Sequence, residues 1–274
     1  MSIVVLSKGS YTMGTEVAER VAERLGYRCL AREVLLEAST EFNVPEAKLV
    51  HAVRDSLSMV DRILHSRQRY IAYIRCALLQ ELCHDEVVYH GFAGNFLVNG
   101  VDHVLKARIE AELSARVALG MARDNVSSRE ARARIERIDQ ERHRWSEQLY
   151  GIDFRDPSLF DLTLHLGRLS THDAVDLICR AVDRKQFQTT PDSQQALEDL
   201  ALAALVNVAL IELAPEIEVG ASAGHIVIRA LPQVTTLAAA AARIEGLASA
   251  VPGVKSVRIE HGSSAAAGGE HRAP

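Results

Sequence analysis

The chain has 274 residues, of which 48% are hydrophobic and 24% are charged, and its formal net charge is −5. This composition is typical of a globular protein with one large domain, or with a domain of about 200 residues and a smaller one. The negative charge gives no general reason to expect nucleic acid or an anionic membrane as a partner. Any phosphate-binding site must therefore be local.

Membrane and metal signals are absent from the sequence. No stretch approaches the ~20 apolar residues that span a bilayer, and the first residues lack the features of a signal peptide. We therefore expect no stable membrane insertion and a cytoplasmic location. The four cysteines are scattered without the spacing of a zinc site or a disulfide framework, and we interpret them as half-buried thiols.

Over the first ~185 residues, short β runs alternate with long helical patterns. Alternation of this kind predicts an α/β fold with a mostly parallel sheet and helices on both faces. The expected strands are Ile3–Leu6, Val87–His90, His103–Ile109 and Leu162–Leu166, and the expected helices are Glu16–Leu25, Arg32–Glu41, Val60–Leu82, Glu112–Arg123 and Asp173–Val182.

The stretch from Ser127 to Tyr150 differs from these helices because it is crowded with Arg and Glu and holds few apolar residues. One interpretation is a solvated helix with i,i+4 charge pairs. The other is a mobile flap whose arginines close over polyphosphate, since the guanidinium fork matches phosphate oxygens. The sequence leaves both open.

A polar connector, residues 186–191, separates the domain 1–185 from a small αββαβ domain, residues 192–262. This domain is predicted to hold a helix over Gln194–Leu213, capped by Asp192 or Ser193, and then a hairpin, a helix and a last strand. The expected hairpin strands are Glu216–Ser222 and His225–Leu231, the helix is Thr236–Ala250, and the last strand is Val254–His261. The tail, 263–274, is small and polar, and we expect it to be disordered.

A strand, a glycine-containing loop and a helix start follow one another at the beginning of the chain. Gly9 and Gly14 have the spacing of the phosphate-loop pattern G-x-x-x-x-G-K-[ST], but Thr15 and Glu16 replace its Lys and its hydroxyl residue. Such a loop aims backbone N–H groups and the helix dipole at one point, where an anion binds readily. The glycine spacing alone does not distinguish a phosphate site from an ordinary strand-to-helix turn.

Several segments together resemble the cytidylate kinase-like family of P-loop kinases, in order and in spacing. They are VAERVAERLGYRCLAREVLLEAS, VVYHGFAGNFL, VLKARIEAELSARV and the most specific one, which runs from Asp139 to Ile178. The resemblance covers residues 1 to 183 and implies a P-loop kinase-like sheet. It also implies transfer of a phosphoryl group from ATP, with Mg²⁺, to a pyrimidine nucleoside monophosphate of the CMP or dCMP class.

The resemblance also implies roles for individual residues. ATP phosphates would lie on the loop, and the acceptor nucleotide near Arg32 and Gly91. Arg116 falls where the family has an arginine near the adenine or the transferring phosphate, and a lid would contribute further arginines. The loop residues are Lys8, Gly9, Ser10, Tyr11, Thr12, Met13, Gly14 and Thr15, and the lid arginines are Arg137, Arg142 and Arg144.

Three positions depart from the family pattern. Thr15 stands at the basic position of the loop, Phe92 replaces the arginine after the third strand, and Ala31 replaces an acid before Arg32. Lys8 is a candidate substitute for the missing basic side chain. The alternative function is therefore a catalytically degraded nucleotide sensor or scaffold.

Two further features leave alternatives open. His90 ends an apolar run and either faces the substrate or is a satisfied rim histidine, and we favour the second. The C-terminal domain resembles a BON-type module through Gly253-Val254-Lys255-Ser256-Val257. This resemblance implies contact with a partner or a second copy of the chain, whereas a generic stabilising domain is the simpler interpretation.

Overall fold

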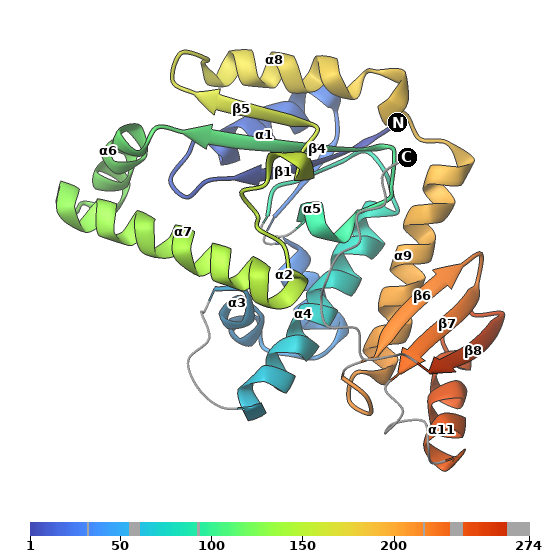
Figure 1. The fold of residues 1–274 in the computed structure, drawn as a ribbon. Helices are drawn as coiled ribbons and strands as arrows, with labels where there is room; N and C mark the ends of the chain where they lie inside the picture. Colours follow the sequence, from blue (N-terminus) through green and yellow to red (C-terminus); the bar gives the residue numbers. More distant parts are fainter. Residues whose placement is uncertain (32, 55–60, 92–93, 216, 231–237, 262–274) are drawn as a thin grey trace. The chain divides into compact units, whose positions relative to one another are not determined.

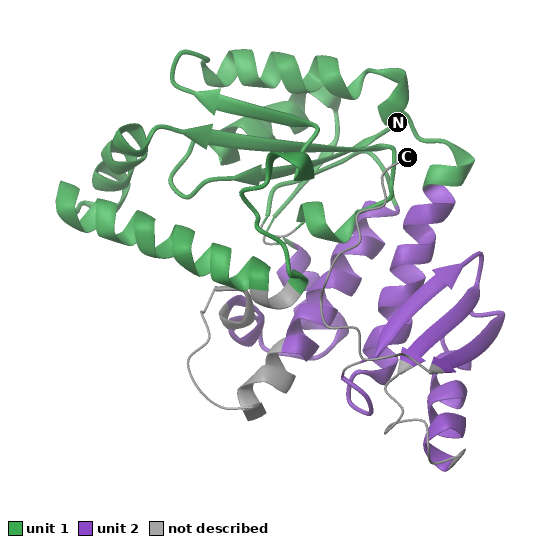
Figure 2. Ribbon diagram, in the orientation of Figure 1, with its two compact units in different colours: residues 1–33, 54–56, 84–193 green, residues 34–53, 57–83, 194–274 purple. Residues whose placement is uncertain are grey.

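A computed structural model describes residues 1–31, 33–54, 61–91, 94–215, 217–230 and 238–261 (Figure 1). The chain forms two compact units, which Figure 2 distinguishes by colour. The first unit comprises residues 1–33, 54–56 and 84–193, and the second comprises residues 34–53, 57–83 and 194–274. Part of the sequence before residue 185 thus groups with the C-terminal elements.

Five parallel strands form the sheet of the first unit, in the order β2-β3-β1-β4-β5, which confirms the predicted parallel sheet. Four of the strands were expected, whereas the three-residue β2 was not. The strands are β1 (Ile3–Lys8), β2 (Arg28–Leu30), β3 (Val87–Tyr89), β4 (Val104–Ala111) and β5 (Leu162–Leu166).

Helices flank this sheet, and two of them, α1 and α8, share one hydrophobic core with β1 and β4. Val17 and Val21 of α1 and Ile178 of α8 are fully buried against strand residues such as Leu6 and Ile109. The helices of the unit are α1 (Gly14–Leu25), α5 (Gly94–Leu97), α6 (Leu113–Asp124), α7 (Ser128–Tyr150) and α8 (Thr171–Val182), with short 3₁₀ turns at Pro157–Leu159 and Lys185–Phe187.

The central strand β1 lies between β3 and β4, so the chain leaves its carboxyl end at the point where the strand order reverses. Ile3 is in register with Val87 on one side and with Val104 on the other. In open parallel sheets, ligands bind in the crevice at such a switch point. The loop after β1 is therefore the first place to look for a site.

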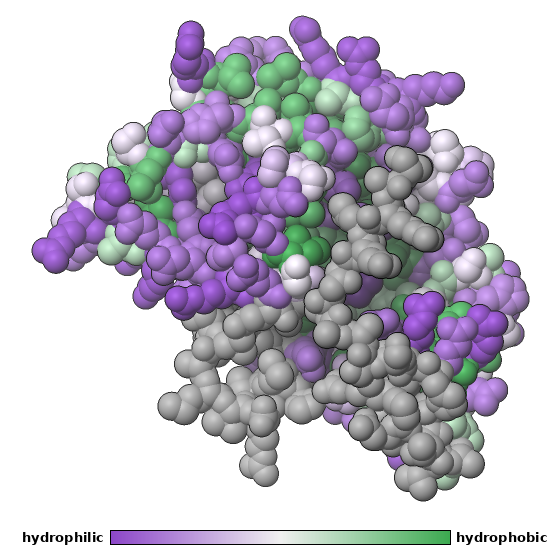
Figure 3. All heavy atoms as spheres, viewed as in Figure 1, coloured by the Kyte–Doolittle hydropathy of each residue, from purple (hydrophilic) through white to green (hydrophobic). Residues whose placement is uncertain are grey.

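The charged stretch of the sequence forms one continuous helix, α7, with a Ser127–Glu130 capping box. Its exposed face carries i,i+4 pairs such as Arg132–Glu136, and hydrophilic side chains cover this part of the surface (Figure 3). The opposite face buries Ile135 against α6. Of the two interpretations that the sequence leaves open, α7 has the solvated, charge-paired face, and it has a second, packed face as well.

The second unit contains helices and the small C-terminal sheet. Its helices before the connector are α2 (Glu33–Glu41), α3 (Glu46–Arg54), which was not anticipated, and α4 (Asp61–Leu82). In the αββαβ domain, β7 pairs antiparallel with β6 and parallel with β8. Its elements are α9 (Pro191–Leu210), β6 (Glu218–Ser222), β7 (His225–Ala230), α11 (Ala238–Ser249) and β8 (Ser256–His261), and its core includes Val206, Leu210, Ile226, Ile228 and Ile244.

Helix α9 begins and ends three residues earlier than predicted. Pro191 takes its first position, and the Thr190 side chain accepts a hydrogen bond of 3.1 Å from the Ser193 N–H. Thr190 is therefore the cap, and not Asp192 or Ser193, because proline favours the first turn of a helix. The expected disordered tail lies outside the described residues. Within the described part of the chain, no helix is long and apolar enough to cross a membrane.

Candidate phosphate-binding site

The loop after β1 runs from Gly9 to Met13, and helix α1 starts at Gly14. The first intrahelical bond runs from the Val17 N–H to the Met13 carbonyl over 3.0 Å. The preceding N–H groups of the first turn have no partner within the helix itself, and they add to the positive end of its dipole. This is the strand-loop-helix arrangement that the glycine spacing predicts.

The loop backbone is tight at two positions. A side chain at Gly14 would place its Cβ 2.7 Å from the Cβ of Lys8, so only glycine fits there. Tyr11 has a φ of 53°, which a bulky residue rarely adopts. Its hydroxyl donates to Asp124, and the Arg123 guanidinium lies 5.6 Å from its ring centroid. These contacts with α6 hold the loop in its strained conformation.

Lys8, at the end of β1, turns its side chain toward the start of α1. Its Nζ donates to the Thr15 hydroxyl and lies 3.2 Å from Nδ1 of His90. Burial, followed by repulsion from Arg142, lowers the pKa of Lys8 to about 8. Burial and the charge of Lys8 lower the pKa of His90 to about 4, so His90 is neutral at pH 7.

Arg116 of α6 joins the loop to α7. Its Nε donates to the Ser10 carbonyl over 2.7 Å, and its Nη2 contacts the Ser10 hydroxyl at 2.5 Å. The same Nη2 lies 2.7 and 2.9 Å from the two carboxylate oxygens of Asp139. The Ser10 hydroxyl donates to Asp139 over 2.8 Å. Loop, α6 and α7 therefore share one polar cluster.

The three arginines that the family resemblance assigns to a lid lie in different surroundings. Arg142 donates to the Lys8 carbonyl over 2.9 Å, and burial lowers its pKa. Arg137 is 69% exposed and lies 3.8 Å from Glu141, and Arg144 is also exposed. Only Arg142 of the three is among the described residues that line the cavity.

The helical periodicity of α7 distinguishes the arginine on its buried face from the two exposed ones. Ile135, Asp139, Arg142 and Ser146 follow one another at i, i+4, i+7 and i+11, so they share one face. Ile135 and Ser146 are fully buried, which fixes that face as the inner one.

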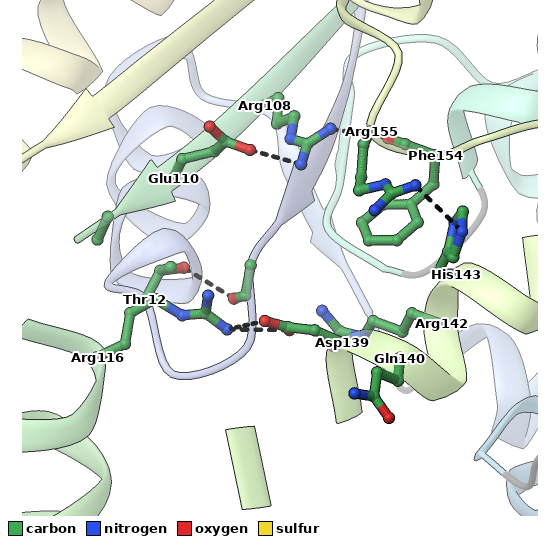
Figure 4. A pocket seen from close by; sticks show the side chains of 12 residues that line it. Thr12, Arg108, Glu110, Arg116, Asp139, Gln140, Arg142, His143, Phe154 and Arg155 are labelled. Carbon is green, nitrogen blue, oxygen red and sulfur yellow. Dashed lines mark hydrogen bonds and ion pairs between the residues drawn. The ribbon is translucent and has the colours of Figure 1, made fainter. Parts of the chain in front are cut away.

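A cavity of about 360 Å³ lies between the loop, β4 and α7 (Figure 4). Figure 4 shows the guanidinium of Arg116 directed at the carboxylate of Asp139. The lining combines arginines with two acidic residues, which makes it suited to anions and to a metal-bound anion. The residues that line it are Gly9, Thr12, Arg108, Glu110, Ala111, Arg116, Asp139, Gln140, Arg142, His143, Phe154 and Arg155.

Sequence reasoning missed the wall of this cavity that β4 forms. Arg108 pairs with Glu110 at 2.5 Å, and its guanidinium lies 5.4 Å from the ring centroid of Phe154. Arg155 forms a paired contact with Asp153 that holds the pKa of this carboxyl well below its usual range. The i,i+2 spacing of Arg108 and Glu110 on one face of a strand was the available signal.

Of the two residues predicted to lie beside the acceptor nucleotide, Gly91 is among the described residues and Arg32 is not. Gly91 follows β3, and a Cβ there would lie 2.0 Å from the Tyr89 hydroxyl oxygen, so a side chain is excluded. The Ala31 N–H donates to the Glu33 carboxylate over 2.7 Å. Arg32 and Phe92 lie outside the described residues.

Metal binding by protein ligands alone is not indicated. The described residues hold no group of three or more His, Cys, Asp or Glu side chains arranged for a metal ion. The cavity does contain two hard oxygen donors, the carboxylates of Glu110 and Asp139. Such donors match Mg²⁺, which usually keeps several waters and shares its coordination with substrate phosphates.

Comparison with known proteins identifies relatives and a shared fold. A family model described as the cytidylate kinase-like family matches residues 3–168. The cytidylate kinase of Methanopyrus kandleri is 26% identical over 193 residues, which cover 67% of this chain and 94% of the relative. That of Sulfolobus acidocaldarius is 28% identical over 105 residues, which cover 38% of this chain and 57% of the relative.

Among solved structures, an uncharacterized protein from Eubacterium ventriosum aligns with a TM-score of 0.51 at 15% identity, covering 68% of this chain and the whole of the other. At this identity the likeness shows the fold alone.

Proposed function

Because this chain belongs to the cytidylate kinase-like family, we propose that it transfers the γ-phosphoryl group of ATP to a pyrimidine nucleoside monophosphate of the CMP or dCMP class. Family and relatives support a nucleotide kinase in general terms. The observation that carries the proposal is the cavity where Arg116 and Arg142 meet the loop of β1. The rival interpretation, a non-catalytic sensor or scaffold, is not favoured by these matches.

The proposed reaction forms a bond between an acceptor phosphate oxygen and the γ-phosphorus. It breaks the bond between that phosphorus and the oxygen bridging to the β-phosphate. Such transfer depends mainly on positioning and on positive charge around the phosphoryl group. Arg116 and Arg142 supply that charge from α6 and α7, and the N-terminus of α1 adds the partial charge of its dipole.

The loop from Lys8 to Thr15 is proposed to bind the ATP phosphates, with Lys8 as its basic side chain. By resemblance, Arg137 and Arg144 complete the set of lid arginines. Their side chains are exposed, so their contribution depends on turning toward bound phosphate. Gly91 and Arg32 are proposed to lie beside the acceptor nucleotide.

Mg²⁺ would be held by Glu110 and Asp139 together with the phosphate oxygens, and when bound it neutralises charge on the transferring group. The carboxylate of Asp139 also orients Arg116, because both of its oxygens accept hydrogen bonds from the guanidinium.

An ADP-release assay with CMP, dCMP, UMP and AMP as acceptors tests the proposal. We expect turnover with CMP or dCMP that exceeds turnover with AMP and requires Mg²⁺. Calorimetric binding of ATP and CMP without ADP formation in a folded sample would support the rival sensor. We also propose a cytoplasmic location, which cell fractionation tests.

The domain limits are proposed as 1–185 for the kinase-like domain and 192–262 for a BON-type module. Gly253 has a φ of 92°, which suits glycine, and Val254 and Val257 pack against the core of the module. We propose that this module binds a partner or a second copy of the chain. Light scattering of the full chain tests self-association, and a monomer at every concentration contradicts that part.

A further inference from the structure

The side chain of Lys8 extends from the end of β1 to the start of α1. Its Nζ donates to the hydroxyl of Thr15, the second residue of α1. An added Cβ at Gly14 would lie 2.7 Å from Cβ and 3.1 Å from Cδ of Lys8, so the lysine stem passes directly over the glycine. The bare Cα of Gly14 therefore gives the Lys8 side chain its path to the helix start.

Two acceptors hold this ammonium. One is the Thr15 hydroxyl, and the other is Nδ1 of His90, 3.2 Å away at the end of β3. An ammonium has three N–H donors, so two acceptors leave one donor for a phosphate oxygen. His90 is neutral at pH 7, which leaves a ring nitrogen able to accept.

The surroundings of the ammonium also favour an anion. Arg142 repels Lys8 and donates to its carbonyl, and the positive end of the α1 dipole lies beside Thr15. A bound phosphate relieves the repulsion between these positive groups. Lys8 is also the only basic residue between Leu6 and Arg20.

From this geometry we infer that Lys8 supplies, from the end of β1, the phosphate-binding cation that P-loops take from the start of the following helix. Thr15 and His90 are then positioning residues that direct its ammonium. The inference rests on the proposed function, in that the phosphate belongs to ATP. It assigns a role to His90 and explains why a threonine at position 15 is compatible with phosphate binding.

Moving the positive charge tests the inference. Lys8→Met should weaken ATP binding and lower kcat by about 100-fold, the scale for losing one transition-state donor. The double variant Lys8→Met with Thr15→Lys places a cation at the helix start instead. Its ATP affinity and kcat should be at least tenfold higher than those of Lys8→Met. Arg20→Met removes an exposed cation of α1 that pairs with Glu16, and it should change neither quantity.

The positioning role of His90 is tested with two variants. His90→Asn retains an acceptor near the position of Nδ1 and should keep the wild-type kcat, whereas His90→Leu should lower kcat about tenfold with the melting temperature preserved. Equal activity of the two variants would overturn the role of His90. If Lys8→Met binds ATP as tightly as the wild type does, the role of Lys8 is overturned. It is also overturned if the double variant recovers neither ATP binding nor kcat.

Calorimetric titration with ATP and Mg²⁺ separates this inference from the proposed function. If the wild type binds ATP but no acceptor is phosphorylated, the proposed function fails, and the binding series still decides the role of Lys8. If Lys8→Met does not fold, the pair of His90 variants decides the inference. Absence of ATP binding by the wild type would overturn the inference itself.

Discussion

Replacing Arg116 by lysine keeps the charge and removes the planar fork that joins loop, α6 and α7. One ammonium cannot contact the Ser10 carbonyl and both oxygens of Asp139 together, so about two hydrogen bonds are lost. Hydrogen bonds to charged groups contribute ~1.5–3 kcal/mol each. Two bonds at the lower end would contribute ~3 kcal/mol. Because Asp139 is 35% exposed and Arg116 13%, solvent screening reduces this, and we take ~2 kcal/mol in total.

For a unit of this size, 1 kcal/mol corresponds to ~2–4 °C in melting temperature, so Arg116→Lys should melt ~4–8 °C lower. Its kcat in the proposed phosphoryl transfer should fall ~100-fold, because the charge that we propose neutralises the transferring phosphate is misplaced. Calorimetric melting and the ADP-release assay measure the two effects. Arg132→Lys, which changes an exposed arginine of α7, is the matched control and should leave both unchanged. An Arg116→Lys variant that melts and reacts like the wild type would refute the polar cluster as a functional unit.

The packing at Gly14, the inner face of α7 and the pKa of Lys8 can each be tested separately. Gly14→Ala should displace the Lys8 side chain and weaken ATP binding at least tenfold in calorimetry. In the control Gly246→Ala, the added Cβ would meet no atom of a neighbouring element within 4 Å, so this variant should stabilise α11 by ~1 kcal/mol and leave binding intact. Arg142→Ala should reduce kcat more than Arg144→Ala, and equal losses would contradict the assignment of the inner face. Since the pKa of Lys8 is about 8, its charge is present below that pH and lost above it, so kcat/KM for ATP should fall as pH rises through about 8; a flat profile would argue against Lys8 as the cation.

The sheet was predictable because its central strands are buried on both faces and read as apolar runs. Ile3, Val4, Val5 and Leu6 are all at most 1% exposed, which is why β1 was the clearest element. Strand β2 was missed because three residues, beginning with an exposed arginine, show no period. Its pairing with β3 comes from tertiary structure, which a local pattern does not report.

The loop was predictable from two glycines, but its partners were not. Lys8 contacts His90, which is 82 residues away in the sequence, and Ser10 contacts Asp139, which is 129 residues away. Such pairs depend on which strands are neighbours and on how α7 crosses the loop. To select Arg142 from the three arginines, one must know which face of α7 is buried. Two buried residues of α7 identify that face.

Helix α7 contacts the loop directly at one point, the end of β1 at a second, and the loop through Asp124 of α6 at a third. The Tyr11 hydroxyl and Arg134 of α7 share the carboxylate of Asp124, Asp139 binds Ser10, and Arg142 binds the Lys8 carbonyl. If α7 acts as the proposed lid, its separation from the loop must break these contacts, and because Arg134, Asp139 and Arg142 lie along one helix we expect them to break together. Opening should therefore be all-or-none, with two discrete populations in exchange and few intermediates.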